Sequence, residues 1–366
     1  MKLTIQTNEL KNALSIVRQS VAGRTSLPVL ENVLISADLK IAEFGNVSFA
    51  CTNLETTLQY TPPLATCRID DEGAVTVNAK MLAEIVATLT DIDVDLVLIS
   101  NSLHITSGRH HSVLPIIAAL DFPPLPTIPE NPTLRLEAGH MLEIVKRVYY
   151  AASVDEARPI LQGINFAGDP NGGLVVSATD GFRVAVFEPS SITYHREPII
   201  IPAKSLTTAA KLPDAGGVAW YITDDQLIIT GATWTFSTQL IAGNFPDIKS
   251  IIPSGYAFSI SVDRLALVTA VKQAMIMRDL VHFDYASGSL TVSAAGDDGN
   301  TTATIPAELY NGEKMSWALN GKFLMDILTN STRPEIYLKL NGGDKPVGVE
   351  AGGEAWTNIV MPMHRG

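Results

Sequence analysis

The chain carries a threefold internal repeat, and this period constrains its architecture more strongly than any single motif. A short strand-like segment begins at Thr4, returns at Leu134 and returns again at Ser259, so the 366 residues divide into thirds of about 120 residues. Each segment leads into a stretch with apolar residues at helical spacing, as at Leu10 and Leu14. The sequence therefore predicts three similar domains derived from one ancestral unit.

Each third contains a second helical stretch and ends in the same way. The second stretch follows a lysine, at Lys80, Lys204 and Lys322. Each third closes on an apolar residue followed by proline, and the first closure runs into a proline-rich link, 123–132. We place the domain boundaries accordingly, at residues 1–126, 127–253 and 254–366.

The distribution of strand-like segments predicts an α+β fold. Each third reads as two half-units, and every half-unit has one helix and several strands, which gives six helices and about two dozen strands in all. Closely spaced hairpins favour antiparallel sheets. We expect each domain to carry two helices on one face of its sheets, so that all six helices share one side of the molecule.

The charge of the chain gives two opposing indications. A net charge of −12 argues against nucleic-acid binding, which usually leaves a basic footprint. However, 11 of the 26 Lys and Arg residues fall on the six predicted helices, while acidic residues cluster elsewhere, as at Asp91, Asp93 and Asp95. Either the helices form a basic surface, or each simply has a solvated face.

Composition narrows the class further. Hydrophobic residues make up 46% of the chain, no apolar run approaches the length of a membrane span, and the N-terminus leads into a strand rather than a signal peptide. We therefore expect a cytoplasmic protein that contacts no membrane. Cys51 and Cys67 are too few for a disulfide framework or a zinc site, and we expect buried thiols.

A search for catalytic and metal-binding motifs finds little. The adjacent pair His110 and His111 belongs to no metal-binding spacing, and no nucleophile elbow or P-loop is present. Residues 171–173 read as a hairpin turn, and residues 297–300 read as a loop tip rather than a calcium loop. We expect no metal and no cofactor.

One turn stands out chemically. In residues 177–185 a strand turns through Asp180 and Gly181 and re-enters as a strand, which places Arg183 beside apolar neighbours. The corresponding turns of the other thirds, at 51–55 and 294–297, lack this set of residues. A pattern confined to one copy of a repeat indicates a site, although a tight hairpin alone would also explain Asp-Gly.

Four segments together resemble one family. They are residues 24–30, residues 178–185, residues 243–247 continuing to Pro253, and the terminal Val360-Met361-Pro362-Met363. In this combination and order they are similar to the bacterial DNA polymerase III beta subunit, the replicative sliding clamp, over the whole chain. The resemblance implies the DNA clamp fold and a head-to-tail dimeric ring, with helices lining the hole and sheets forming the outer wall.

The resemblance also implies three sets of functional residues. If the helices face duplex DNA, their basic residues lie opposite phosphates and read no sequence, and the acidic loops face outward. The family's DNA-facing positions suggest Arg24 and Lys204, and position on the predicted helices alone adds Lys80, Lys146 and Lys272 as DNA-facing candidates. The candidates for a groove that receives peptide motifs of partner proteins are Leu161, Thr179, Gly181, Phe182, Arg183, Val184, Pro246, Ile251, Pro346, Ile359, Met361, Pro362 and Met363. The dimer contact is expected near Leu114 of one subunit and near Met275 and Ile276 of the other.

The implied function is that of a non-enzymatic processivity factor. Its partners would be double-stranded DNA, a second copy of the chain, the replicative DNA polymerase, a clamp-loader ATPase and other proteins with clamp-binding motifs. The chain departs from common family residues at Ala203, Phe182, Ser250 and its final residues, 364–366. Two alternatives stay open: a specialised clamp paralogue, and an enzyme with an acid/base site around Asp180, Arg183 and the histidine pair.

Overall fold

The computed structural model describes residues 1–23, 25–39, 45–310, 314–353 and 355–364. Contacts divide the chain into two compact units, and each is built on its own antiparallel sheet. Unit 1 comprises Met1–Met141 and Lys204–Leu240, and unit 2 comprises Leu142–Ala203 and Ile241–Gly366. The middle third of the sequence is therefore shared between the two units.

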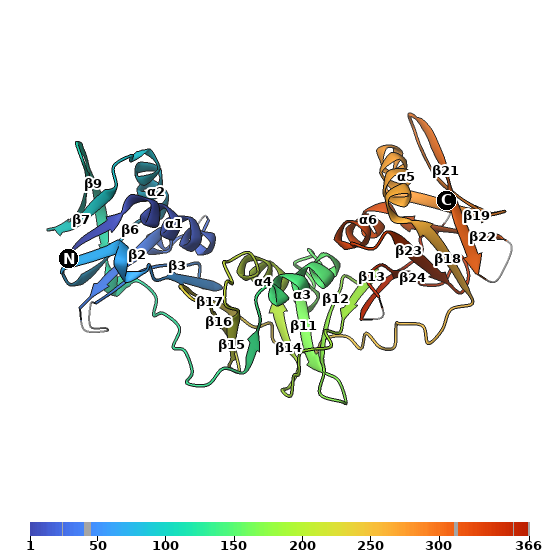
Figure 1. The fold of residues 1–366 in the computed structure, drawn as a ribbon, viewed down its shortest axis with the longest axis horizontal. Coiled ribbons are helices and arrows are strands. Elements are labelled where there is room, and N and C mark those ends of the chain that lie inside the picture. The colour runs from blue at the N-terminus through green and yellow to red at the C-terminus, as the bar shows by residue number, and fades with distance from the viewer. Residues whose placement is uncertain (24, 40–44, 311–313, 354, 365–366) are drawn as a thin grey trace. The chain divides into compact units, whose positions relative to one another are not determined.

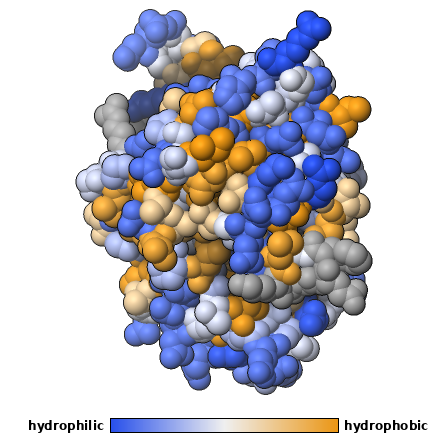
Figure 2. All heavy atoms as spheres, turned by 90° about the vertical axis from the view of Figure 1, so that its left-hand side faces the viewer, coloured by the Kyte–Doolittle hydropathy of each residue, from blue (hydrophilic) through white to orange (hydrophobic). Residues whose placement is uncertain are grey.

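Unit 1 holds a 13-stranded sheet in the order β10-β15-β16-β17-β4-β3-β2-β6-β9-β8-β7-β1-β5. Its strands are β1 (Lys2–Gln6), β2 (Asn32–Asp38), β3 (Asn46–Thr52), β4 (Thr56–Tyr60), β5 (Cys67–Asp71), β6 (Gly73–Asn78), β7 (Asp93–Ile99), β8 (Ser102–Ser107), β9 (His110–Ala118), β10 (Leu134–Leu136), β15 (Val218–Ile222), β16 (Gln226–Thr230) and β17 (Trp234–Gln239). Its helices are α1 (Thr7–Val17), α2 (Ala79–Thr88) and, from its second residue, α4 (Ala203–Ala209). Figure 2 faces the end of this unit and shows hydrophobic residues gathered among hydrophilic ones on its surface.

Unit 2 holds a 12-stranded sheet in the order β14-β11-β12-β13-β25-β24-β23-β18-β21-β20-β19-β22. Its strands are β11 (Gly163–Gly168), β12 (Leu174–Thr179), β13 (Arg183–Phe187), β14 (Ile199–Pro202), β18 (Phe258–Asp263), β19 (Leu280–Ala286), β20 (Ser289–Gly296), β21 (Gly299–Tyr310), β22 (Lys314–Asn320), β23 (Glu335–Leu340), β24 (Val347–Glu350) and β25 (Trp356–Val360). Its helices are most of α3 (His140–Val148), α5 (Arg264–Met277) and α6 (Gly321–Asn330).

The six predicted helices are confirmed, and local capping explains where three of them begin. The side chains of Asn78, Asp263 and Asn320 accept hydrogen bonds from the first backbone N–H groups of α2, α5 and α6. Each of these helices then buries apolar residues at helical spacing, such as Leu82 and Val86 in α2. Within the described part of the chain, no helix is long and apolar enough to span a membrane.

Four of the helices pack in two pairs, and a basic side chain ties each of these two pairs together. Helices α1 and α2 lie side by side in unit 1, as α5 and α6 do in unit 2 (Figure 1). Lys11 of α1 donates to the carbonyl of Leu89 beyond the end of α2, over 2.9 Å. Arg264 of α5 donates to the carbonyls of Leu328 and Arg333 at the end of α6. These cations satisfy backbone groups that a helix end leaves unpaired.

Two strand pairings join the thirds of the sequence into the two sheets. In unit 1, β4 of the first third pairs with β17 of the middle third. In unit 2, β13 of the middle third pairs with β25 of the last third. We call these the unit 1 seam and the unit 2 seam. The candidate peptide groove lies on the unit 2 seam.

Candidate functional site

The turn between β12 and β13 is held by side-chain hydrogen bonds. The Thr179 hydroxyl donates to the carbonyl of Arg183 at 2.7 Å and accepts from the N–H of Gly181 at 3.1 Å. One carboxylate oxygen of Asp180 accepts from the N–H groups of Phe182 and Arg183. Gly181 has a φ of +91°, a left-handed conformation that favours glycine. The predicted Asp-Gly hairpin is confirmed.

The side chain of Arg183 binds other residues of unit 2. Its side chain is only 11% exposed, and its Nε and Nη1 atoms contact carboxylate oxygens of Asp180 at 2.9 Å and of Asp326 at 2.6 Å. The guanidinium also lies over the ring of Phe323, 4.3 Å from its centroid. Because Asp326 and Phe323 belong to α6, Arg183 ties the hairpin to that helix.

The C-terminal segment is attached to the same hairpin. In the unit 2 seam Val184 pairs with Ile359. Beyond the strand, the N–H of Met361 donates to the carbonyl of Phe182 at 2.8 Å, and the N–H of Met363 donates to the carbonyl of Ala318 at 2.9 Å. The segment 361–363 is thereby held against unit 2.

This seam has a buried apolar cluster, which we call the floor, and exposed apolar side chains around it, which we call the rim. Val184, Val186, Ile248 and Ile359 form a buried cluster, against which Val175, Phe245, Ile252 and Tyr256 pack. Around it, four apolar side chains are exposed to solvent: Phe182 (58%), Met363 (43%), Ile251 (38%) and Met361 (38%). Exposed apolar groups next to a buried apolar floor are typical of binding surfaces.

The remaining groove candidates lie in less exposed positions. Leu161 is half-buried, and its N–H donates to the carbonyl of Arg158. Pro346 is half-buried and precedes Val347, which pairs with Val360. Pro246 is exposed in the segment after β17.

Sequence reasoning missed two residues of this region. The Arg158 guanidinium lies beside the hairpin, with Nη1 3.4 Å from the position that a Cβ on Gly181 would occupy. Asp326 was missed because its contact with Arg183 spans 143 residues of sequence. The only sequence signal for Arg158 is its place two residues after a small acidic turn, Asp155 and Glu156.

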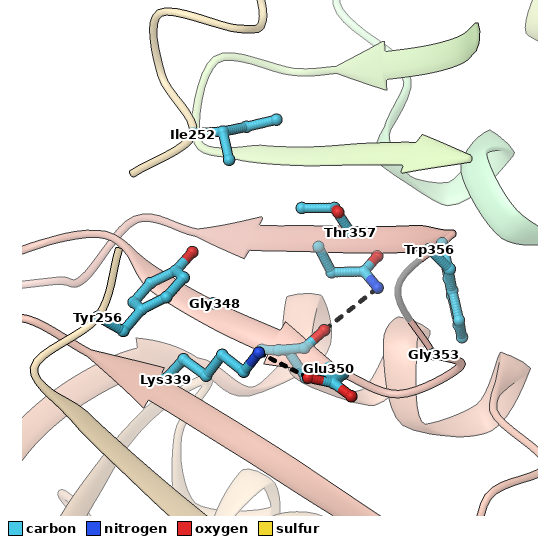
Figure 3. Close-up of a pocket in the computed structure, with 10 residues that line it drawn as sticks. Ile252, Tyr256, Lys339, Gly348, Glu350, Gly353, Trp356 and Thr357 are labelled. Carbon is cyan, nitrogen blue, oxygen red and sulfur yellow. Dashed lines mark hydrogen bonds and ion pairs between the residues drawn. The ribbon is translucent and has the colours of Figure 1, made fainter. Parts of the chain in front are cut away.

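A cavity of about 230 Å³ adjoins the apolar cluster (Figure 3). Its lining includes Ile252, Tyr256, and Lys339 and Glu350, which form an ion pair at 2.6 Å. A Cβ at Gly348 would lie 2.6 Å from the Tyr256 hydroxyl, so a side chain here would displace the tyrosine ring. Burial raises the pKa of Tyr256 above its ordinary value.

The basic residues of the helices fall into two groups. Lys80, Lys146, Lys204 and Lys272 are exposed on α2, α3, α4 and α5. Others serve the fold: Lys11 and Arg264 bind helix-end carbonyls, Lys322 pairs with Asp279 at 2.6 Å, and Arg147 stacks on the ring of Trp356. The remaining DNA candidate, Arg24, lies outside the described residues.

The candidate dimer residues differ in exposure. Ile276, near the end of α5, is 77% exposed, and the neighbouring Met275 is half-buried. Leu114 in β9 is buried, but the adjacent Val113 is 47% exposed. Of these positions, Ile276 and Val113 therefore offer apolar surface to a partner.

Two of the four residues suggested for an acid/base site bind each other. Asp180 and Arg183 pair with each other, and His110 and His111 are exposed at the start of β9. The described residues form no group of three His, Cys, Asp or Glu side chains suited to a metal ion. Burial raises the pKa of Cys51 and raises that of Cys67 to about 11, so both thiols are neutral at pH 7.

Comparison with known proteins agrees with this fold over the whole chain. Models of the N-terminal, central and C-terminal domains of the DNA polymerase III beta subunit match residues 1–126, 135–247 and 249–364. The beta sliding clamps of Synechococcus elongatus and Bacillus subtilis are 28% and 25% identical, and each match covers 99% of both chains. Among solved structures, the sliding clamp of Bacillus subtilis matches with a TM-score of 0.92 at 24% identity, and that of Pseudomonas aeruginosa with a TM-score of 0.90 at 25% identity, each over 100% of both chains.

Three repeated domains, each with antiparallel strands and two helices, define a clamp fold. The chain belongs to the DNA polymerase III beta subunit family, and its function is that of a sliding clamp.

Proposed function

We propose that two copies of the chain form a head-to-tail ring that encircles duplex DNA and tethers the replicative polymerase and other clamp-binding proteins. The observation that carries the tethering role is the unit 2 seam, where an exposed apolar rim surrounds a buried apolar floor. The domains would be residues 1–126, 127–253 and 254–366. No step of this function requires catalysis or a cofactor, and its setting would be the cytoplasm.

The proposed DNA contact is electrostatic. Lys80, Lys146, Lys204 and Lys272 are exposed on four different helices, where each can meet a phosphate without reading a base. Few contacts mean a weak, salt-sensitive grip, which suits sliding. Retention on DNA would then depend on closure of the ring rather than on affinity.

Strand edges support the proposed head-to-tail contact. Residues 110–115 of β9 pair with β8 on one side, and only residues 116–118 pair with β6 on the other. Likewise, residues 299–306 of β21 pair with β20, while residues 307–310 pair with β18. Among the described residues, each strand thus has a stretch with a single partner, and such edges can add a strand from another subunit. We propose that β9 of one subunit faces β21 of the other.

The peptide contact would use the rim and floor of the unit 2 seam. Leu and Phe side chains of an extended partner peptide would pack against Phe182, Ile251, Met361 and Met363, above Val184 and Ile359. Flexible methionine side chains can repack around different ligands, which suits a protein with several partners. The aromatic Phe182 and the small Ser250 would tune motif preference, so a specialised role among clamps is the second candidate.

The ring is tested by loading the protein onto nicked circular DNA with a clamp-loader ATPase and then cutting the circle. We expect the protein to remain on the circle and to leave after linearisation. Release that is independent of DNA ends would contradict the ring.

The groove is tested separately, by binding of a polymerase-tail peptide with Leu and Phe anchors. We expect removal of residues 361–366 to weaken binding by more than tenfold, because the methionine rim is lost. Unchanged binding would place the peptide elsewhere.

A further inference from the structure

The hairpin between β12 and β13, next to the unit 2 seam, has a counterpart in unit 1 between β3 and β4. The Thr52 hydroxyl donates to the carbonyl of Thr56 and accepts from the N–H of Leu54. The side-chain oxygen of Asn53 accepts from the N–H groups of Glu55 and Thr56. These four hydrogen bonds match, position by position, those of Thr179 and Asp180, although the sequences differ.

The strands on either side of the two hairpins also correspond. In the unit 1 seam the N–H of Gln239 donates to the carbonyl of Glu55 at 3.1 Å, as Met361 does to Phe182 in unit 2. Further along, the N–H of Thr61 donates to the carbonyl of Thr233, as Glu188 does to Ala355. The backbone of the proposed peptide groove is therefore present twice in one chain.

The side chains on this second backbone have a different chemistry. The correspondence places Glu55 where unit 2 has Phe182, and Thr57 where it has Val184. In the facing strand it places Ser237 where unit 2 has Ile359, and Gln239 where it has Met361. A floor that is apolar in unit 2 becomes hydroxyl-bearing in unit 1, and a carboxylate replaces the aromatic ring of the rim.

A cavity lies at the unit 1 seam. It has a volume of about 490 Å³ and lies between the hairpin, the proline-rich link 123–127 and the ends of β16 and β17. Glu55 and Asp225 are exposed on its wall, and both lie beside the end of β17, because their carbonyls accept from the N–H groups of Gln239 and Leu240. Among its lining residues, all of them described, none is Lys or Arg.

One lining residue is strained in a way that core packing does not explain. Leu54 adopts a φ of +74°, a left-handed conformation that a branched side chain rarely takes, at the position of Gly181 in the other hairpin. Its side chain is nevertheless 53% exposed and lines the cavity. Such strain concentrates at functional sites.

We propose that the unit 1 seam is a second docking groove, which takes an extended peptide with Lys or Arg residues on both sides of an apolar side chain such as Leu. The carboxylates of Glu55 and Asp225 would pair with the basic residues. Leu54 and Leu125 would contact the apolar side chain, and hydroxyl and amide groups of the floor would bind the peptide backbone. The inference rests on the proposed clamp function, since it assigns the peptide to proteins that this clamp recruits.

The test uses a fluorescent eight-residue peptide with a central Leu and two Lys on each side, and a second peptide in which Glu replaces Lys. Binding to the full-length protein is measured by anisotropy at low salt. We expect the lysine peptide to bind and the glutamate peptide not to bind. In the double variant Glu55→Gln, Asp225→Asn the affinity for the lysine peptide should fall at least fivefold, and added salt should remove the difference.

A matched control carries Asp297→Asn and Asp298→Asn, which remove the same charge from an exposed loop tip. Equal weakening in both double variants, or no binding of the lysine peptide to the unaltered protein, would overturn the proposal. Binding of a Leu/Phe-anchored peptide to the unit 2 seam should be the same in all three proteins. If only that binding is absent, the proposed peptide tether fails while the second groove stands.

Discussion

At the scale of single residues, Arg183 acts by positioning other groups. Asp326 contacts Arg183, Arg183 contacts Asp180, and Asp180 accepts from the N–H of Phe182. The carbonyl of Phe182 in turn holds Met361. This chain of contacts links a carboxylate on α6 to two exposed rim residues.

We therefore expect Asp326→Ala to weaken binding of the Leu/Phe-anchored peptide by about three- to tenfold, because an ion pair with a half-exposed carboxylate, which contributes about 1 kcal/mol, no longer orients the hairpin. Asp326→Asn, which keeps an acceptor, should recover part of the loss. Peptide affinity and Tm are measured together, with Asp298→Ala as the control. If affinity does not change, Asp180 alone suffices to hold Arg183.

At the scale of elements, the pairs α1/α2 and α5/α6 are each joined by one cation that charge alone would assign to DNA binding. Lys11 binds the carbonyl of Leu89, whereas Lys80 is exposed on the adjacent helix. Two lysines in one helix pair thus have different tasks, one in the fold and one on the surface.

Lys11→Met should lower the free energy of unfolding by about 1 kcal/mol, because a helix-end carbonyl loses its charged donor. Lys80→Met should leave stability within about 0.5 kcal/mol of the original value and weaken DNA binding with a shallower salt dependence. Denaturant titration and DNA anisotropy separate the two effects. Similar stability losses in both variants would show that the distinction between them is wrong.

At the scale of the whole molecule, the proposed ring depends on apolar surface that a single chain leaves exposed. Ile276 at the end of α5 is 77% exposed, and Leu265 at the start of the same helix is 61% exposed. Only the former was predicted to lie at the dimer contact.

Ile276→Asp should shift the protein from dimer to monomer, because a carboxylate buried in an apolar contact costs about 2–4 kcal/mol, or roughly 30- to 1,000-fold in affinity. Leu265→Asp is the matched control and should remain dimeric. Light scattering after size-exclusion chromatography measures both, across a range of concentrations. Two dimeric variants would remove Ile276 from the contact.

Much of the local structure could be predicted from particular residues. The Asp180-Gly181 turn follows from side-chain acceptors and a left-handed glycine, and the helices follow from apolar spacing. At Thr52–Thr56, in contrast, the residue types differ from those at Thr179–Arg183 and predict a different turn. The structure shows the same hydrogen bonds, since Asn and Asp offer the same acceptor to the backbone.

The three repeats and the six helices could be predicted because they depend on residue spacing and on local hydrogen bonding, and the family could be predicted from four short segments. The pairing of β4 with β17, the contact of Asp326 with Arg183 and the binding of Lys11 to a helix-end carbonyl became visible only in the folded chain. Such contacts join residues far apart in sequence. Their partners are chosen by the packing of whole sheets, which no local pattern records.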